Sequence, residues 1–252
     1  MSKRGQMGLS PMSPISPIEP MGPVGFVFDL DGTLLDTLGD LAASVNYALR
    51  QHHMPEHPID NIRRFVGNGV AKLIERAVPN GIDNPQYSSV LCSFREYYLE
   101  HSLDTTHPYD GIMETLTELK ARGCPMAVVS NKFMTATQEL VRHFFGGLIE
   151  VAIGEHEAEG IRKKPAPDTV FEALRQLGIQ SPQNTQNILN TQNTPTTIYY
   201  IGDSDVDIMT ARNSGLPCVS VLWGFRDKEF LLAHGATTLI THPSELLKVG
   251  LT

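Results

Sequence analysis

Short apolar runs alternate with longer amphipathic stretches along most of the chain. Short apolar runs bounded by turn residues are typical of buried strands, and apolar positions that recur every three or four residues indicate helices. Strands are predicted over Val24–Phe28, Pro125–Val129, Leu148–Ile153, Thr197–Ile201 and Cys218–Leu222. Alternation of strands and helices is the pattern of a parallel sheet with crossover helices, so the predicted fold class is α/β.

The residues from 38 to 107 break this alternation, because three successive stretches there have helical periodicity. They are LGDLAASVNYALRQHH, IRRFVGNGVAKLIERAV and PQYSSVLCSFREYYLEHS. We therefore predict an all-helical cap over residues 38–107, inserted after the first strand. Residues 24–37 and 108–252 are predicted to form the core.

Two segments differ from the core in composition. Residues 1–23 carry a proline at every third position from Pro11 to Pro23, which favours a polyproline II or disordered leader. A ligand for a proline-binding domain and an organelle transit peptide are alternative interpretations of this leader. Residues 181–197 are rich in Gln, Asn and Thr and are predicted to form a polar loop insertion. Because this loop leads into the amino end of a strand, we expect it to lie far from a ligand site at the carboxyl ends.

The overall charge and the cysteines limit the partners and the compartment. The 252 residues carry a formal net charge of -8 and no dense Lys/Arg cluster, which argues against nucleic acid and against an anionic membrane. The three cysteines show no CxxC spacing, which favours a reducing cytoplasm. No apolar run approaches the roughly 18 residues of a membrane helix. A small anion is still a compatible partner, and the oligomeric state is left open.

The stretch FDLDGTLLD places two carboxylates, Asp29 and Asp31, where the first predicted strand ends. Two like charges so close together repel each other unless a cation compensates them. Mg²⁺ prefers one or two carboxylates together with water and phosphate oxygens, so this pair favours phosphate chemistry. The alternative is a simple turn, in which Asp31 and Gly32 reverse the chain and Asp29 is only a cap.

Three further strand ends carry polar groups that suit the same chemistry. Ser130 and Asn131 follow the second strand and precede a helix, where backbone N–H groups bind anions. The KKPAPD stretch holds Lys164 in an extended segment before a proline. Asp203 ends the fourth strand, and the spacing of Ser204 and Asp207 predicts a capping box. The alternatives are that the polar residues are ordinary helix caps and that the lysine is a solvated surface residue.

Taken in order, FDLDGTLLD, SNK, KKPAPD and IGDSDVDIMTARNSG resemble the four motifs of the haloacid dehalogenase superfamily, and the resemblance extends over residues 24–247. It implies a Rossmann-like core with an inserted cap. It also implies that Asp29 is a nucleophile that forms an aspartyl phosphate and that Asp31 is the general acid and base. Mg²⁺ would be held by Asp29, by the Asp31 carbonyl and by Asp203.

The same resemblance assigns the remaining motif residues. Ser130, Asn131 and Lys164 would hold the phosphoryl oxygens, and Asp207 and Thr33 would support the site. Dehalogenases and phosphonatases lack an aspartate at the position of Asp31, so both branches are disfavoured. The expected partner is a small phosphorylated metabolite.

The cap stretch RRFVGNGVAKLIERAV and the linker HPYDGIMETLTELKARG resemble those of phosphoglycolate phosphatases, which implies 2-phosphoglycolate as the substrate. Arg63, Arg64, Asn68 or Lys72 would then contact the substrate from the cap. The alternative is that VGNG is a plain turn between helices and that these cations face solvent. A pyrophosphatase, a sugar phosphatase and a phosphosugar mutase are rival enzymes, and a non-catalytic binding protein is a more distant alternative.

Overall fold

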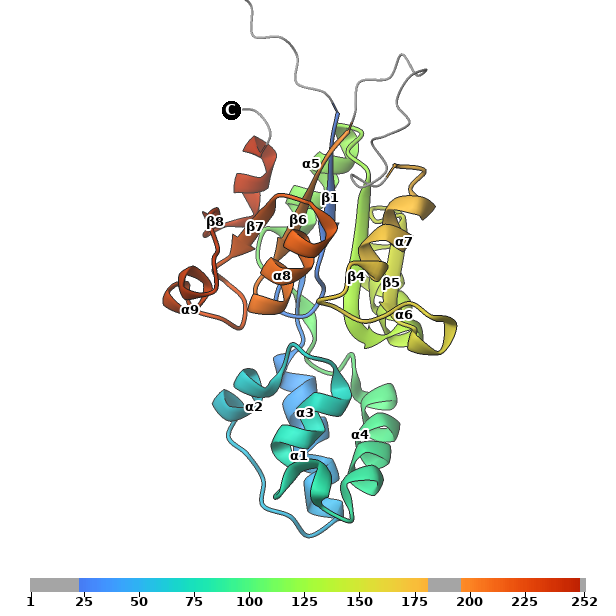
Figure 1. The fold of residues 1–252 in the computed structure, drawn as a ribbon, viewed down its shortest axis with the longest axis vertical. Coiled ribbons are helices and arrows are strands. Elements are labelled where there is room, and N and C mark those ends of the chain that lie inside the picture. Colours follow the sequence, from blue (N-terminus) through green and yellow to red (C-terminus); the bar gives the residue numbers. More distant parts are fainter. Residues whose placement is uncertain (1–22, 181–195, 250–252) are drawn as a thin grey trace, which may run out of the picture.

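The computed structural model describes residues 23–180 and 196–249. The predicted leader, apart from Pro23, and the polar insertion, apart from its last two residues, lie outside the described residues. A six-stranded parallel sheet with the strand order β5-β4-β1-β6-β7-β8 forms the core, which confirms the predicted α/β class (Figure 1). The strands are β1 (Val24–Phe28), β4 (Met126–Phe133), β5 (Val151–Glu155), β6 (Thr197–Gly202), β7 (Cys218–Val221) and β8 (Leu239–Ile240).

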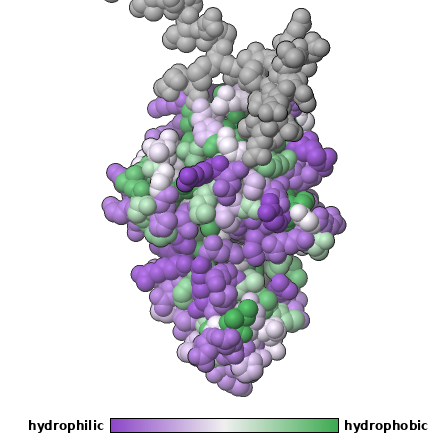
Figure 2. Space-filling model, viewed as in Figure 1, coloured by the Kyte–Doolittle hydropathy of each residue, from purple (hydrophilic) through white to green (hydrophobic). Residues whose placement is uncertain are grey.

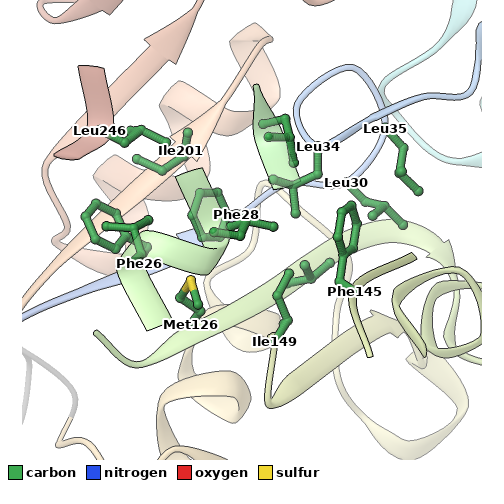
Figure 3. Close-up of a cluster of buried hydrophobic side chains, with 14 of the residues drawn as sticks. Phe26, Phe28, Leu30, Leu34, Leu35, Met126, Phe145, Ile149, Ile201 and Leu246 are labelled. Carbon is green, nitrogen blue, oxygen red and sulfur yellow. The ribbon is translucent and has the colours of Figure 1, made fainter. Parts of the chain in front are cut away.

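Helices cover both faces of this sheet because its central strand is apolar on both sides. The core helices are α5 (Ile112–Ala121), α6 (Met134–Phe145), α7 (Asp168–Gln176), α8 (Asp205–Ser214), α9 (Lys228–Ala233) and the 3₁₀ helix η4 (Pro243–Lys248). Phe26 and Phe28 pack in one cluster with α5, α6 and η4, and Figure 3 shows these two rings beside Met126 and Ile201. Val27 points to the opposite face and packs in a cluster with α7 and α8.

An all-helical segment follows β1 and lies at the end of the sheet where β1 ends (Figure 1). It comprises the α-helices α1 (Leu38–Gln51), α2 (Ile59–Phe65), α3 (Val70–Ala77) and α4 (Tyr87–His101) and the 3₁₀ helix η1 (Gly81–Asp83). This segment has a hydrophobic cluster of its own, which includes Val45, Ile74 and Phe94. The stretch read as one helix from Ile62 is in fact two, because Gly67 and Gly69 have φ angles of 123° and 86°, which interrupt helical geometry.

The two chain connections between the core and the cap are tied to each other. β2 (Leu35–Asp36) and β3 (His107–Pro108) form a small antiparallel pair. Beside it, the buried carboxylate of Asp40 accepts hydrogen bonds from the backbone N–H and the hydroxyl of both Thr105 and Thr106, at 2.6–3.2 Å. The cap therefore enters and leaves the core through one hydrogen-bonded junction.

Two strand predictions needed correction, and one strand of the main sheet was missed. β4 continues beyond Val129 to Phe133, through a register irregularity that carries the SNK residues within the strand. β5 begins at Val151, because Leu148 and Ile149 belong to the turn after α6, although both side chains pack against the core. β8 was missed because only two residues pair with β7. No helix within the described ranges is long and apolar enough to cross a membrane.

Candidate active site

β4, β1 and β6 are the central neighbours in the sheet, and their carboxyl ends lie side by side at the edge that faces the cap (Figure 1). Chain order reverses here, since β4 and β5 lie on one side of β1 and β6 to β8 on the other. In open α/β sheets such a switch point leaves a crevice that binds ligands. Asp29 follows β1 directly and Asp203 follows β6, so both carboxylates enter this crevice.

Three buried carboxylates cluster there. Oxygens of Asp29, Asp203 and Asp207 lie within 4.8 Å of one another, and the residues are 6%, 1% and 0% exposed. The backbone around the cluster can approach this closely only because two glycines lack a side chain. A Cβ on Gly32 would stand 2.4 Å from an oxygen of Asp203, and one on Gly224 would stand 2.3 Å from the Asp203 Cβ.

Asp207 is saturated by protein donors. One of its oxygens accepts hydrogen bonds from Lys164 Nζ and Tyr200 Oη, each at 2.9 Å. The other accepts from the backbone N–H of Asp203 and from the N–H and hydroxyl of Ser204, which confirms the capping box at the start of α8. Asp207 therefore orients Lys164 and the end of β6.

Lys164 is the buried counter-ion of this cluster. Its ammonium donates to Asp29 at 2.6 Å, to Asp207 at 2.9 Å and to Tyr200 Oη at 3.2 Å, so all three donors have partners. Burial alone would lower the pKa of Lys164, but Asp207 and Asp29 outweigh it and raise the pKa, so the lysine is charged. Asn131 holds its backbone, accepting from the Lys164 N–H at 2.7 Å and donating to its carbonyl at 3.0 Å.

The remaining carboxylate oxygens fit a divalent cation. One oxygen of Asp29 binds Lys164, and one of Asp203 accepts the Phe225 N–H at 2.6 Å. The second oxygen of each has no hydrogen-bond donor among the residues described. Burial, followed by repulsion from Asp207, raises the pKa of Asp29 and raises the pKa of Asp203 to about 7. Two buried carboxylates with open oxygens are consistent with a site for a hard divalent cation.

Asp31 stands apart from this cluster, on the cap side. Its Oδ1 accepts a hydrogen bond from the Thr37 hydroxyl at 2.7 Å and lies 3.2 Å from Lys132 Nζ. The Lys132 ammonium also donates to Tyr98 Oη of α4 at 2.6 Å. Burial would lower the pKa of Lys132, but Asp31 and Tyr98 outweigh it, so the pKa is raised and the side chain is a cation. The second oxygen of Asp31 has no donor within the described part of the chain.

A small cavity of about 50 Å³ joins these groups. The core residues that line it include the acids Asp29 and Asp31, the polar residues Ser130 and Asn131, and three cations, which are Lys132, Lys164 and Arg226. The cap contributes only apolar residues and glycines, which are Leu41, Val66, Gly67, Gly69, Val70 and Leu73. Thr33 does not line the cavity, and its buried hydroxyl has no hydrogen-bond partner.

The cap cations predicted from sequence lie elsewhere. Arg63, Arg64 and Asn68 line a wider groove of about 710 Å³ outside the cavity. Asn68 accepts a hydrogen bond from Arg76 at 2.7 Å, and Lys72 pairs with Glu75 on the surface. The structure therefore does not bring these residues together with the acid cluster.

Arg226 separates the groove from the cavity. It follows β7 and donates to the carbonyls of Arg63 and Val66, at 2.8 and 2.7 Å, at the end of α2. Sequence reasoning missed this residue and also Lys132. The signal was available, because WGFR follows the fifth predicted strand at the same edge of the sheet, and Lys132 belongs to the SNK motif.

Known proteins are similar to this chain over most of its length. The model of the haloacid dehalogenase-like hydrolase family matches residues 26–221. A phosphoglycolate phosphatase of Aquifex aeolicus is 30% identical over 224 residues, which are 88% of this chain and 94% of that protein. An N-acetylmuramic acid 6-phosphate phosphatase of Pseudomonas aeruginosa is 29% identical, over 88% of this chain and 92% of that protein.

A solved structure agrees over the cap and the core. A protein of Lactobacillus delbrueckii subsp. bulgaricus, provisionally named a phosphoglycolate phosphatase, superposes with a TM-score of 0.79 and 34% identity, over 90% of this chain and 98% of the other. Match length, identity and geometry agree, so this chain belongs to the haloacid dehalogenase-like hydrolase family.

Proposed function

We propose that this protein is a Mg²⁺-dependent phosphatase that hydrolyses 2-phosphoglycolate to glycolate and phosphate. The observation that carries the proposal is the pair of buried carboxylates, Asp29 and Asp203, with open oxygens beside the charged Lys164. Relatives named for phosphatase activity on phosphorylated metabolites support the same reaction class.

The residues of the chain divide the work between two half-reactions. In the first, a carboxylate oxygen of Asp29 attacks phosphorus, the bond from phosphorus to the leaving oxygen breaks, and Asp31 gives its proton to that oxygen. In the second, Asp31 takes a proton from water, the water oxygen attacks phosphorus, and the bond to Asp29 breaks. Asp31 lines the same cavity as Asp29, as both transfers require.

Charge balance explains the rest of the site. Asp29, Asp31, Asp203 and Asp207 face two buried ammonium groups, so with all four carboxyl groups ionised the site would carry a formal excess of two negative charges. When bound, Mg²⁺ supplies positive charge that offsets the repulsion between the Asp29 carboxylate and the phosphoryl oxygens. Lys164 and the hydroxyl of Ser130 are placed to hold those oxygens, and Asn131 positions Lys164 through its backbone.

Cavity size favours a small leaving group. A volume of about 50 Å³ has room for a few water-sized groups in the present position of the cap. A phosphoryl group with a two-carbon acid fits this limit better than a hexose phosphate or a nucleotide does. The groove outside Arg226 favours a second candidate, a larger sugar phosphate that reaches the cavity from there, as the relative from Pseudomonas aeruginosa suggests.

The test is phosphate release with Mg²⁺ from 2-phosphoglycolate, N-acetylmuramic acid 6-phosphate, pyrophosphate, glucose 1-phosphate, glucose 6-phosphate and nucleoside monophosphates. We expect the highest kcat/KM for 2-phosphoglycolate. Asp29→Asn removes the nucleophile and should lower the rate by roughly 1,000-fold or more. Preference for a sugar phosphate would retain the reaction class and reject this substrate, and residual turnover of clean Asp29→Asn near the wild-type rate would reject the nucleophile.

A further inference from the structure

We propose that Lys132 is a specificity-determining residue that binds a carboxylate on the leaving group. This inference rests on the proposed function. It deepens that function by assigning recognition of the substrate's anionic tail to the core strand β4 instead of the cap.

No cap side chain that lines the cavity can pair with a carboxylate. Every described cap residue at the cavity wall is apolar or a glycine. The arginines of α2, Arg63 and Arg64, are exposed and face the outer groove. The side chains that can pair with a charged tail inside the cavity therefore come from the core.

Among the three cations of the cavity wall, Lys132 is the one that lies beside Asp31 with a donor available. Lys164 lies in the acid cluster, where it contacts Asp29, Asp207 and Tyr200, and it is assigned to the phosphoryl oxygens instead of the leaving group. Arg226 directs both terminal nitrogens at backbone carbonyls at the end of α2, so its guanidinium is held against the cap. Lys132 has two described partners, Asp31 and Tyr98, and an ammonium carries three N–H groups.

Position assigns this donor to the leaving group. Asp31 gives its proton to the leaving oxygen, so the leaving group lies beside Asp31 in the first half-reaction. Lys132 Nζ is 3.2 Å from Asp31 Oδ1, and its side chain is only 3% exposed. In 2-phosphoglycolate a single methylene separates the ester oxygen from the carboxylate. A buried ammonium next to the proton donor can therefore reach that carboxylate, and burial strengthens the interaction because water does not compete.

The alternative is that Lys132 only positions Asp31. A pair of substrates separates the two roles, because ethyl phosphate is 2-phosphoglycolate with a methyl group in place of the carboxylate. We expect Lys132→Met to lower kcat/KM for 2-phosphoglycolate by about 10- to 100-fold more than for ethyl phosphate, as the loss of a charge-assisted hydrogen bond predicts. Tyr98→Phe is the matched control, since it removes the other partner of the ammonium and keeps the cation. Tyr98→Phe should change kcat/KM for both substrates by the same factor.

Each outcome decides the inference. An equal loss on both substrates in Lys132→Met would show that Lys132 acts through Asp31 and would overturn it. A wild-type enzyme that hydrolyses both esters equally well would also overturn it, while leaving the phosphatase intact. A wild-type protein that releases phosphate from no ester would reject the proposed function and the inference with it. If Lys132→Met does not fold, the double variant Lys132→Met/Tyr98→Phe removes both sides of the buried pair, and the same substrate ratio applies.

Discussion

Asp203 has the features of a metal ligand, and the same features lower the stability of the protein when no metal is bound. It is 1% exposed, it accepts one hydrogen bond from the Phe225 N–H, and it leaves its other oxygen open. A buried carboxylate without full compensation is destabilising in its charged form. A cation at this point removes that penalty, so binding and stability are linked.

The first prediction concerns pH and Mg²⁺. Burial raises the pKa of Asp203 from 3.8 to about 7, and it raises the pKa of Asp29 in the same direction. Between these values the folded protein holds protons that the unfolded chain has lost, so metal-free stability falls as pH rises from about 4 to 7. Mg²⁺ competes with those protons. We expect excess Mg²⁺ to raise Tm by on the order of 5 °C at pH 8 and by much less at pH 5.

Differential scanning calorimetry with EDTA and with MgCl₂ at both pH values measures this difference. Asp203→Asn is the control, because it removes the carboxylate and should abolish most of the gain at pH 8. An equal gain in Tm at pH 5 and pH 8 would contradict the linkage.

For single residues, the sequence predicted the acids of the site better than the side chains that contact them. Asp29, Asp203 and Asp207 could be placed because each follows or caps an element at the carboxyl edge of a parallel sheet. Lys132 could not be assigned to Asp31, since their contact depends on the bend at the end of β4. Tyr98 could not be predicted either, because it belongs to the cap helix α4, and its contact with Lys132 depends on how the cap lies on the core.

At the scale of elements, the loop after β7 links the cap to the core. Helix α2 ends at Phe65, and the last carbonyls of a helix have no partner within it. Arg226 supplies donors to the carbonyls of Arg63, Arg64 and Val66 from the core side. The loop therefore fixes the position of Val66 and Gly67, which line the cavity.

The second prediction is that Arg226→Met loosens this contact without disturbing the acid cluster. We expect kcat/KM to fall by about 10-fold, which corresponds to ~1.4 kcal/mol and to the loss of one or two hydrogen bonds to a charged donor. Hydrogen exchange should become faster at residues 63–69, because their carbonyls lose a core partner. Arg142→Met changes an exposed arginine of α6 and should alter neither quantity. Unchanged exchange at residues 63–69 in Arg226→Met would contradict the linking role.

Elements were predicted well where periodicity was long and poorly where it was short. β1 was predicted at its observed bounds, and α1 and α4 lie within predicted helical stretches. β8, β2 and β3 have two residues each, too few for any periodicity to appear. β5 was placed too early because the apolar turn residues Leu148 and Ile149 pack on the same core as the strand.

At the scale of the whole molecule, separate hydrophobic clusters define the cap and the core. The cap cluster contains residues of α1 to α4, and the core clusters lie on either side of the sheet. The face seen in Figure 2 is mainly hydrophilic over both parts, with small scattered hydrophobic patches. Phe133 of β4 and Phe225 of the loop after β7 pack against the cap cluster from the core side. Polar contacts add to this packing at the Asp40 junction, at Arg226 and in the Lys132–Tyr98 pair.

The last prediction concerns the Asp40 junction. Asp40→Ala leaves four donors of Thr105 and Thr106 without their acceptor at a site where Asp40 is 2% exposed and Thr106 is 6% exposed. Thr105 is exposed, so its donors can turn to water, whereas the two donors of the buried Thr106 are left unsatisfied. We therefore expect a loss of about 3 kcal/mol in the free energy of unfolding and a drop in Tm of roughly 6–12 °C. Asp104→Ala is the matched control. Asp104 lies at the same junction but pairs with His101 on the surface, where an ion pair contributes little.

Comparing the two variants shows whether the Asp40 hydrogen bonds stabilise the position of the cap on the core. If Asp40 fixes the hinge, Asp40→Ala should also lower kcat/KM, because cap residues such as Val66 then line the cavity for a smaller fraction of the time. Activity should recover partly at lower temperature, where the remaining cap contacts hold. A Tm for Asp40→Ala within about 1 °C of that for Asp104→Ala would mean that water satisfies the threonine donors, and the relation of cap to core would then rest on Arg226, Lys132 and the packing of Phe133 and Phe225.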